Sequence, residues 1–583
     1  MKQSNNENLD NLRHSTAHLL AAAVMELWPN TKRTIGPAIE NGFYFDFDFG
    51  DVKISESDFP QIEKKMRELL PSWKSFSRHE LPLKDAKKEY PQNQFKHELI
   101  DEFSQKGQKL TFYKSGNYWD LCRGGHIDHP NQDLKHFKLL KIAGAYWRGS
   151  EKNKMLTRIY GTSFPTKKEL DDYLWKQEEA RKRDHKKLGR ELDLFLISDE
   201  VGPGLLIWTP KGAAIRHEIE KFIVSEQINR GYMHVYSPHI GKKSLWQTSG
   251  HWDLYRDKMY APMKIDDTEY LVKPMNCPIH MMVYKSHPRS YRDLPLRIAE
   301  IASVYRYEQM GELSGMTRVR YITQDDSHIF CRKDQVVDEF IGVLDYTVFL
   351  MKAFHIKDYS FRLSLRDSQH KDKYLGTDNI WQEAEYKLET AVKKTGLPYD
   401  KCEGEAAFYG PKLDVMIKDA LGRQWQCGTI QIDFMLPDRF NLEYINEKGQ
   451  KERPALIHRA PLGSLERFVG ILIEHYAGKF PLWLSPVQTV LIPIADRHLE
   501  FAQKVSNQLA SNGIRIEIDS RNESMQGKIR ERTLQKVPYM GIIGDREVKS
   551  LSISIRSRDG ENIGILSISD FIERLKTEID KRS

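Results

Sequence analysis

The order of hydrophobic and polar residues predicts three regions of different texture. In the first, LRHSTAHLLAAAVMELW predicts an amphipathic helix and GFYFDFDF predicts a strand. The run KKELDDYLWKQEEARKRDHKKLG carries charges of both signs all round, which is typical of a helix that connects two domains. Gly189, at the end of that run, is predicted to stop the helix.

The middle region mixes strand-like and helical patterns. Strands are predicted at YLVKP, LRIAEIASVYRYE and QIDFML, and a helix at AAIRHEIEKFIVSEQI. The two patterns do not alternate strictly, and pairs that look like hairpins are frequent. The region is therefore predicted to hold an antiparallel or mixed sheet with helices around it.

The last region alternates more regularly. Strands are predicted at TVLIPIA, RIEID, YMGIIG and SISIRS, and helices through FAQKVSNQLA, MQGKIRERTLQ and DFIERLKTEI. This predicts a compact α/β domain of about a hundred residues. No glycine-rich phosphate fingerprint follows its first strand, which argues against a dinucleotide site. We divide the chain into residues 1–165, a helical linker at 166–190, a central region at 191–483 and a terminal domain at 484–583.

Composition restricts the class of protein. A chain of 583 residues is too long for one core, and 40% hydrophobic with 29% charged residues is typical of a folded soluble protein. The chain has no apolar run of about 18 residues, and its start, MKQSNNENLD, lacks a signal core. Five cysteines form no disulfide pattern, so a reducing cytoplasm is expected. The net charge of +7 permits a polyanionic partner without requiring one.

Arginines mark the first candidate site. SVYRYEQMGELSGMTRVRYITQDDSHIF sets Arg306, Arg318 and Arg320 around a Gly-rich loop between two strand-like runs. Because a guanidinium group binds phosphate oxygens in a bidentate manner, this loop could clamp a triphosphate. A surface hairpin with solvated arginines is the alternative. In IHRAPLGSLERFVGILIE, a small-residue turn leads into an amphipathic helix with Arg467 in its first turns.

These elements resemble a known enzyme family. YRYE with the downstream RVR, and GSLERF, resemble motifs 2 and 3 of class II aminoacyl-tRNA synthetases, and SPHI resembles motif 1, the dimer element of that class. MNCP, TQDDSHIF, FYGPKLD, QWQCGTIQIDF and IHRAPLGSLERF resemble threonyl-tRNA synthetases in particular. The resemblance covers essentially the whole chain. It implies an N-terminal α+β editing domain, a catalytic core on an antiparallel sheet, a C-terminal α/β anticodon-binding domain, and a homodimer.

The resemblance also gives the cysteine of VKPMNCPIH a role. Cys277 belongs to no C-x-x-C pair, and a lone cysteine is usually a buried thiol. The resemblance implies that Cys277, His328 and His458 bind one zinc ion, whose open positions receive the amino and hydroxyl groups of threonine. Valine lacks the hydroxyl group, and an apolar pocket would separate the two amino acids only about a hundredfold. A site that must ligate the hydroxyl would reject valine more strongly.

Further roles follow residue by residue from the same resemblance. Asp326 would accept a hydrogen bond from the substrate ammonium group, and Tyr409 and Gln431 would line the threonine pocket. Around ATP, the resemblance assigns the α-phosphate and the attacked carboxylate to Arg306, adenine to Glu308, and the γ-phosphate end to Arg318 and Arg467, with Arg467 close to the adenine face. Gln324, Lys412 and Gln426 would lie in the same site, and Mg²⁺ is expected with ATP.

The first region offers a second candidate site. Serine keeps the hydroxyl group and lacks one methyl group, worth roughly 1–3 kcal/mol, so a second, hydrolytic site is needed. HSTAH places His14 and His18 on one helical face, and DLCRGGH supplies Cys122 and His126. From the residues alone this set looks like a zinc site. The resemblance instead implies an editing site that hydrolyses mischarged seryl-tRNA without an obligatory metal, and it adds to that pocket Tyr44, Lys96 and Asp120.

The terminal domain resembles the anticodon-binding domain of several class II enzymes. Its two polar stretches, DSRNESMQGKIRERT and GDREVKSLSISIRSR, carry the residues expected to bind anticodon bases, namely Asn522, Arg530, Glu547 and Arg556. Other arginines are expected to touch phosphate or solvent, namely Arg532, Arg546 and Arg558. Many bacterial members begin with a ubiquitin-like domain. This chain opens almost directly on the HSTAH helix, so that domain is expected to be absent.

Three functions remain to be weighed. A threonine–tRNA ligase accounts for every motif named above. A zinc hydrolase centred on His14, His18, Cys122 and His126 leaves the arginine loop and the terminal domain unexplained. A non-catalytic RNA-binding relative would be expected to lose motif arginines or zinc ligands, and all are present. A relative that charges proline or serine is disfavoured by Cys277 and TQDDSH.

Overall fold

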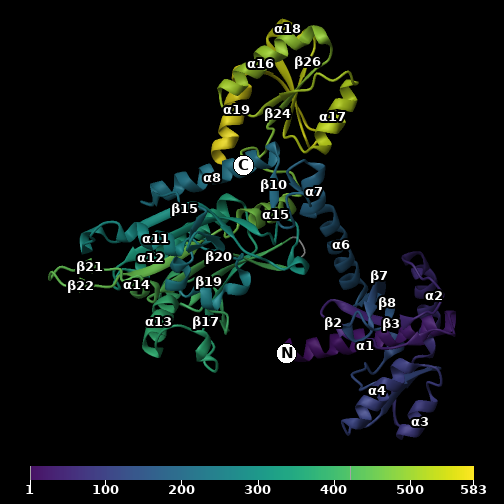
Figure 1. Cartoon of the computed structure of the whole chain (residues 1–583). Coiled ribbons are helices and arrows are strands. Elements are labelled where there is room, and N and C mark those ends of the chain that lie inside the picture. Colours follow the sequence, from purple (N-terminus) through teal and green to yellow (C-terminus); the bar gives the residue numbers. More distant parts are fainter. Residues whose placement is uncertain (1, 420–421, 583) are drawn as a thin grey trace. The chain divides into compact units, whose positions relative to one another are not determined.

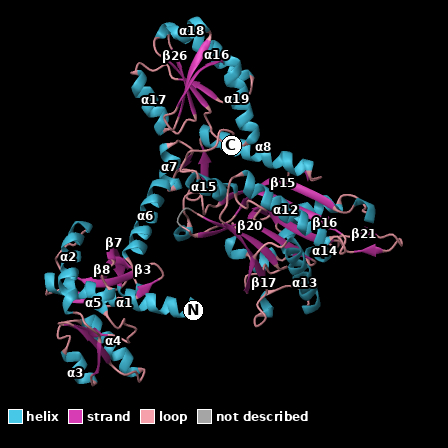
Figure 2. Ribbon diagram, turned by 180° about the vertical axis from the view of Figure 1, so that it is seen from behind, coloured by secondary structure: helices cyan, strands magenta, loops and turns pink. Residues whose placement is uncertain are grey.

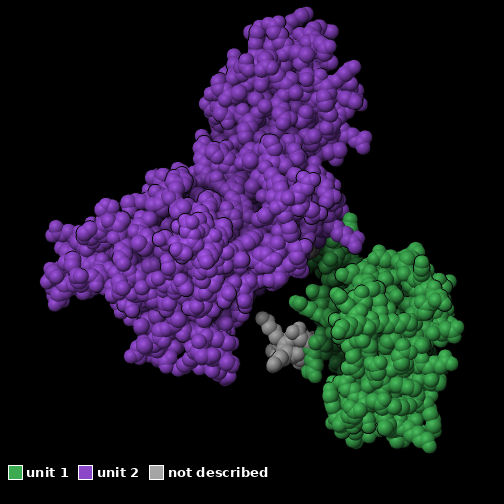
Figure 3. All heavy atoms as spheres, viewed as in Figure 1, with its two compact units in different colours: residues 1–178 green, residues 179–583 purple. Residues whose placement is uncertain are grey.

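The computed structural model describes residues 2–419 and 422–582, which contain helices and strands throughout (Figures 1 and 2). The chain forms two compact units, residues 1–178 and 179–583 (Figure 3). In the described ranges, no helix is long and apolar enough to cross a membrane.

The first helix differs from its predicted character. Helix α1 (Lys2–Leu27) is buried on every side between residues 15 and 24, so it is not amphipathic over that stretch. The reason is that it packs against α2 (Phe59–Leu69) and also against strands β2 (Ala38–Ile39), β3 (Gly42–Asp48) and β8 (Met155–Ser163). The alanines of HLLAAAV let these elements approach closely.

Two sheets build the rest of the first unit. The larger has the order β1-β3-β8-β7, with β2 paired to β3, where β1 is Lys32–Arg33 and β7 is Phe137–Tyr146. The predicted strand GFYFDFDF is confirmed as β3. The smaller sheet has the order β4-β5-β6, with strands Ser77–Glu80, Thr111–Ser115 and Tyr118–Leu121. Its companion helices are α3 (Leu83–Lys88) and α4 (Gln94–Gln105), and the short α5 (Pro130–Asp133) precedes β7.

The predicted connecting helix is two helices, and Gly189 does not stop it. Helix α6 (Lys167–Arg183) ends before Asp184, whose carboxylate caps α7 (His185–Glu191) by accepting from the backbone N–H groups of Lys186 and Lys187. Gly189 lies inside α7. A Cβ atom there would come within 2.2 Å of the Phe195 ring, so the glycine permits close packing.

The centre of the second unit is an eight-stranded sheet with the order β11-β15-β16-β23-β20-β19-β17-β18. These strands are Met233–His234, Leu296–Tyr305, Tyr321–Cys331, Ala455–Ala460, Gln424–Asp433, Lys412–Lys418, Tyr359–Leu365 and Tyr399–Glu403. The six strands from β15 to β17 are antiparallel, and only the two edge strands pair in parallel. The prediction of an antiparallel or mixed sheet is therefore confirmed, and the sheet is mixed.

Helices cover this sheet and bury its apolar side chains. The longer ones are α8 (Pro210–Asn229), α11 (Cys277–Lys285), α12 (Val336–Ala353), α13 (Asp378–Thr395) and α15 (Leu465–His475). The short ones are α9 (Ser244–Thr248), α10 (His251–Leu254) and α14 (Leu436–Arg439). Small strands complete the region: β9 (Phe195–Ile197) with β10 (Leu206–Trp208), β12 (Ile240–Lys242) with β14 (Thr268–Val272) and β13 (Met263–Ile265), and β21 (Tyr444–Ile445) with β22 (Lys451–Glu452).

The terminal α/β domain follows its prediction closely. Its sheet has the order β25-β24-β26-β27-β28, with strands Ile516–Ile518, Thr489–Pro493, Tyr539–Ile543, Ser552–Ser557 and Asn562–Ser567. Its helices are α16 (Leu499–Ser511), α17 (Met525–Leu534), α18 (Asp545–Ser550) and α19 (Ile568–Lys581). Strand β28 was not predicted, and the hydrophobic pattern of NIGILS around Gly564 is weak.

Candidate functional site

A pocket on the eight-stranded sheet gathers the residues predicted for the central site. It is lined from β16, β19, β20 and β23, from the loop 306–320 between β15 and β16, and from the turn before α15. We call residues 306–320 the arginine loop. The predicted residues that line the pocket are Cys277, Arg306, Glu308, Arg318, Gln324, Asp326, Tyr409, Lys412, Gln426, Gln431, His458 and Arg467. His328 is fully buried and contacts His458.

Strand register brings the three predicted zinc ligands together. His328 on β16 lies directly opposite His458 on β23, and their ring centroids are 4.8 Å apart. Cys277 is the first residue of α11. Ligand atoms of the three side chains all lie within 4.8 Å of one another, and all three residues are buried. The geometry therefore offers one sulfur and two imidazole nitrogens to a single ion.

The hydrogen bonds of these rings fit a metal. His328 Nε2 and His458 Nδ1 are buried and have no hydrogen-bond partner among the described residues. The opposite nitrogen of each ring is held, His328 Nδ1 by His280 Nδ1 at 2.7 Å and His458 Nε2 by Asp433 Oδ2 at 2.9 Å. Buried polar atoms without a partner are costly, and a zinc ion would satisfy both. Burial also lowers the pKa of His328 well below its usual value, which keeps the ring neutral, as a ligand must be.

A buried chain of hydrogen bonds fixes the orientation of His328. Glu300 Oε2 accepts from His280 Nε2 at 3.1 Å, so His280 Nδ1 is left to accept the proton of His328 Nδ1. Glu300 is itself held by the backbone N–H of Ser237 at 2.8 Å. This arrangement leaves the lone pair of His328 on Nε2, the atom that has no other partner among the residues described.

The threonine-pocket residues lie beside these ligands. Gln431 on β20 is opposite His458 in the strand register and accepts a 2.7 Å hydrogen bond from Tyr409 Oη. The Tyr409 ring centroid is 5.1 Å from that of His458. Asp326 accepts a 2.8 Å hydrogen bond from Asn276 Nδ2, next to Cys277. The residues predicted to bind threonine therefore form one cluster with the predicted metal ligands.

The arginines occupy the other part of the pocket. The guanidinium of Arg306 lies 5.8 Å from the Tyr255 ring centroid, and its buried Nε has no partner in the described part of the chain. Arg467 donates from Nε to Thr317 O at 2.9 Å and from Nη1 to Gln426 O at 2.7 Å. Arg318 is the most exposed of the three, 3.7 Å from a Glu308 oxygen. An anion would find three guanidinium groups here, one of which, that of Arg306, has an unsatisfied donor.

Asp414, which was not predicted, holds two pocket residues. Its carboxylate accepts from Lys412 Nζ at 2.7 Å and from Gln426 Nε2 at 2.6 Å, and Ser364 Oγ donates to it at 2.8 Å. Strand periodicity could have found it, since residues 412 and 414 face the same side of β19. Without this buried carboxylate, the ammonium of Lys412 would lose the partner that fixes its position.

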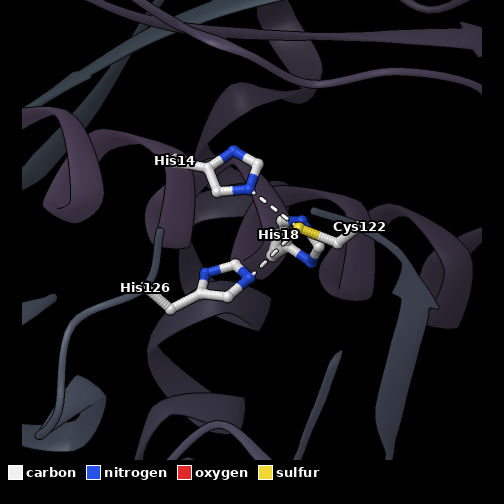
Figure 4. A group of neighbouring side chains, drawn as sticks. All are labelled: His14, His18, Cys122 and His126. Atoms are coloured by element: carbon white, nitrogen blue, oxygen red, sulfur yellow. Dashed lines mark hydrogen bonds between the residues drawn. The ribbon is translucent and has the colours of Figure 1, made fainter. Parts of the chain in front are cut away.

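The first unit gathers four residues of the second candidate site (Figure 4). His14 Nε2 lies 3.0 Å from Cys122 Sγ, and His126 Nε2 lies 3.3 Å from the same sulfur. Ligand atoms of His14, His18, Cys122 and His126 all lie within 4.8 Å of one another. Burial raises the pKa of the Cys122 thiol to about 11, and burial with the neighbouring His14 lowers the pKa of His126 to about 3. These groups are therefore neutral near pH 7.

A buried charge network lies beside them. Asp120 is paired with Lys96 Nζ at 2.9 Å and with Arg33 Nε at 3.2 Å, and all three are largely buried. Burial opposes the charge of Asp120, but Lys96 and Arg33 outweigh it and hold the pKa of that carboxyl well below its usual range. Tyr44 lies on β3, where its ring stacks under the Arg158 guanidinium at 3.7 Å. Arg33 was not predicted.

The predicted anticodon residues lie on the terminal domain. Asn522, Arg530 and Arg556 are exposed, and Glu547 is half-buried and caps its own helix through the backbone N–H of Gly544. Two of the arginines expected to meet phosphate or solvent are partly buried and are also bonded to other residues of the chain. Arg532 pairs with Glu517 and Asp519, and Arg558 donates to the carbonyl oxygens of residues 479, 480 and 536.

Comparison with known proteins agrees with this geometry. Residues 260–476 match the tRNA synthetase class II core domain (G, H, P, S and T), residues 488–578 the anticodon binding domain, and residues 110–160 the threonyl and alanyl tRNA synthetase second additional domain. A threonine–tRNA ligase of Cytophaga hutchinsonii is 51% identical over 98% of this chain and 88% of its own length. One from a Sulfurihydrogenibium species is 48% identical over 100% of this chain and 90% of its own.

Solved structures point the same way. The RNA binding domain of a threonyl-tRNA synthetase from Cryptosporidium parvum matches with a TM-score of 0.63 at 39% identity, over 68% of this chain and 98% of that one. A putative threonyl-tRNA synthetase from Aeropyrum pernix matches with a TM-score of 0.60 at 29% identity, over 69% and 97%. The predicted class II core with its editing-type and anticodon-binding domains is thereby confirmed, and the chain belongs to the threonine–tRNA ligase family.

Proposed function

We propose that this protein joins threonine to its tRNA in two steps. The threonine carboxylate first attacks the α-phosphate of ATP, which gives threonyl-adenylate and releases pyrophosphate. A hydroxyl of the terminal ribose of tRNA then attacks the threonyl carbonyl, which forms the ester and releases AMP. Arg306 would hold the α-phosphate and the attacking carboxylate, Glu308 the adenine, and Arg318 with Arg467 the γ-phosphate end. Mg²⁺ would accompany ATP. The single observation that best supports this is one pocket that joins three arginines, among them Arg306 with its unsatisfied Nε, to the cluster of Cys277, His328 and His458.

We propose that Cys277, His328 and His458 hold one zinc ion that selects threonine. When bound, the ion would offer open coordination positions to the amino and hydroxyl groups of threonine, which valine cannot fill. The chain's own residues would complete the selection. Asp326 would accept a hydrogen bond from the ammonium group, and Tyr409 with Gln431 would enclose the side chain.

We propose that the first unit hydrolyses seryl-tRNA. His14, His18, Cys122 and His126 would position and activate water, with no metal required, beside the buried pair of Lys96 and Asp120. Tyr44 would contribute to the same pocket. The terminal domain would bind the anticodon through the set predicted above, namely Asn522, Arg530, Glu547 and Arg556.

We propose that the working form is a cytoplasmic homodimer. All five cysteines, each within the described ranges, are free thiols, which suits a reducing compartment. The segment around SPHI exposes large apolar side chains, among them Tyr236, of which 95% is accessible, with Met233 and Ile240. Such side chains on a stretch that resembles motif 1 fit a subunit contact.

Amino-acid-dependent ATP–pyrophosphate exchange tests the ligase and its selectivity together. We expect exchange with threonine, weaker exchange with serine and none with valine, from protein that carries one zinc per subunit. Serine is expected to react because the pocket discriminates one methyl group only weakly. Absence of exchange with all three amino acids, in zinc-loaded protein, would reject the ligase and favour a non-catalytic RNA-binding role.

The editing proposal predicts a separable defect. We expect His14→Ala to slow hydrolysis of seryl-tRNA about a hundredfold, because a positioned acid–base group is lost, while threonine activation is unchanged. Deacylation of purified seryl-tRNA measures the first and pyrophosphate exchange the second. His129→Ala, at an exposed histidine near the same site, is the matched control. The wild type, His14→Ala and His129→Ala should carry the same amount of zinc. A His14→Ala protein with less zinc would show that this site holds metal.

A further inference from the structure

One buried histidine joins the connecting helices to the arginine loop. His185 is the first residue of α7, and only 4% of it is exposed. Its Nδ1 lies 2.7 Å from Glu474 Oε1 on α15, and its Nε2 lies 3.2 Å from the backbone nitrogen of Met316 in the arginine loop. A carboxylate only accepts and a backbone N–H only donates, so Nδ1 carries the proton and Nε2 accepts. The ring therefore connects α15 to the loop in one defined tautomer.

The packing around this ring is close enough to fix the loop. Gly315 has φ of +48°, and a Cβ atom there would come within 2.3 Å of His185 Nε2. On α15, a Cβ atom at Gly470 would lie 3.2 Å from Met316 Cβ and 3.7 Å from the ring. Two glycines thus leave the space that the imidazole occupies. Any larger residue at 315 would have to displace the ring or the loop.

The next residue of the loop is held from the same helix. Arg467, on α15, donates from Nε to the carbonyl of Thr317 at 2.9 Å. Residues 316 and 317 are thus held by two side chains that both depend on α15, one through Glu474 and one directly. Arg318 follows at once and lines the pocket. A shift of the backbone at 316 would therefore displace the Arg318 guanidinium from the pocket.

We propose that His185 is a positioning residue that holds the arginine loop, through the N–H of Met316, in the conformation that binds ATP. The expected effect on ATP rests on the proposed activation of threonine with ATP, but the observed contacts of His185 do not. His185 touches neither substrate nor the reacting atoms. Its effect should fall on ATP rather than on threonine. The residues proposed to bind threonine are outside 315–317: Asp326 lies on β16, Gln431 on β20 and Tyr409 in the segment before β19.

Two substitutions separate the contacts of the ring. His185→Gln can place its amide oxygen near the former Nε2 and keep an acceptor for Met316. His185→Asn can keep a donor near the former Nδ1 for Glu474 but loses the acceptor. We expect His185→Asn to raise the KM for ATP about fivefold, as for one lost hydrogen bond, with the KM for threonine changed less than twofold. His185→Gln should stay within twofold of the wild type. His217→Asn, at an exposed histidine on α8, is the control.

A second readout does not depend on activity. Hydrogen–deuterium exchange of the peptide spanning 310–320 includes the Met316 N–H, and exchange of this peptide should speed up in His185→Asn but not in His185→Gln. Gly315→Ala should also raise the KM for ATP with the histidine intact. Gly342→Ala, on α12 and with open space among the described atoms, should not. If the wild-type protein activates no amino acid, the proposed ligase function is rejected. Amide exchange still tests whether His185 holds the Met316 N–H. Equal behaviour of the Gln and Asn variants in both readouts, or faster amide exchange without a change in KM, would overturn the proposal.

Discussion

Cys277→Ala is expected to remove zinc from the protein and to lower kcat/KM for threonine activation about a thousandfold, because the threonine hydroxyl then loses the partner that the site is built to supply. Two imidazoles remain, but His328 and His458 alone offer only two of the three donor atoms that converge within 4.8 Å. Removing the thiol also leaves their unpartnered nitrogens buried without a ligand. Zinc per subunit and pyrophosphate exchange with threonine measure the two effects.

Cys331→Ala is the matched control for this substitution. Cys331 ends β16 and is buried, as Cys277 is, but it lies outside the cluster of ligand atoms. The control should keep one zinc per subunit and most of the threonine activity, with some loss of thermal stability from the cavity. If Cys277→Ala also keeps its zinc and its exchange rate within tenfold, the assignment of the three ligands is wrong.

The catalytic cluster shows which parts of a site can be predicted from local sequence. The motifs around Cys277, His328 and His458 are recognisable one by one, but the ligands are separated by 51 and 130 residues, and no spacing rule joins such distant positions. Their meeting depends on the pairing of β16 with β23, which the hydrophobic pattern of either strand does not specify. The family resemblance supplied this information, and local physical reasoning did not.

The same limit explains the residues that were not predicted. His185 contacts Met316, 131 positions away, and Arg33 contacts Asp120 across two sheets, so neither has a local signal. The prediction for Gly189 was wrong because glycine is common both at helix ends and at positions of close packing. Here it is the close approach of the Phe195 ring that requires a glycine. The terminal domain was the most predictable region, because most of its strands and helices alternate along the chain and each carries its own periodicity.

Arg306→Ala is expected to lower the rate of threonyl-adenylate formation about a thousandfold, since one preorganised cationic donor is lost from the charge that develops at the α-phosphate. The backbone N–H of Arg306 donates to Arg320 O at 3.0 Å, so the main chain is anchored while the guanidinium keeps a buried Nε without a partner in the described ranges. Arg306→Lys should recover little, because an ammonium lacks the planar pair of donors. A single-turnover measurement of adenylate formation gives this rate.

The pattern of losses distinguishes the arginine from the cysteine. Arg306→Ala should keep its zinc and its preference for threonine over valine, whereas Cys277→Ala should lose both. Arg332→Ala, a partly exposed arginine paired with Asp334 just after β16, should leave the rate unchanged. A rate for Arg306→Ala within tenfold of the wild type would mean that the α-phosphate is held elsewhere in the pocket. Arg467 would then be the first alternative, because its guanidinium already spans the arginine loop and β20.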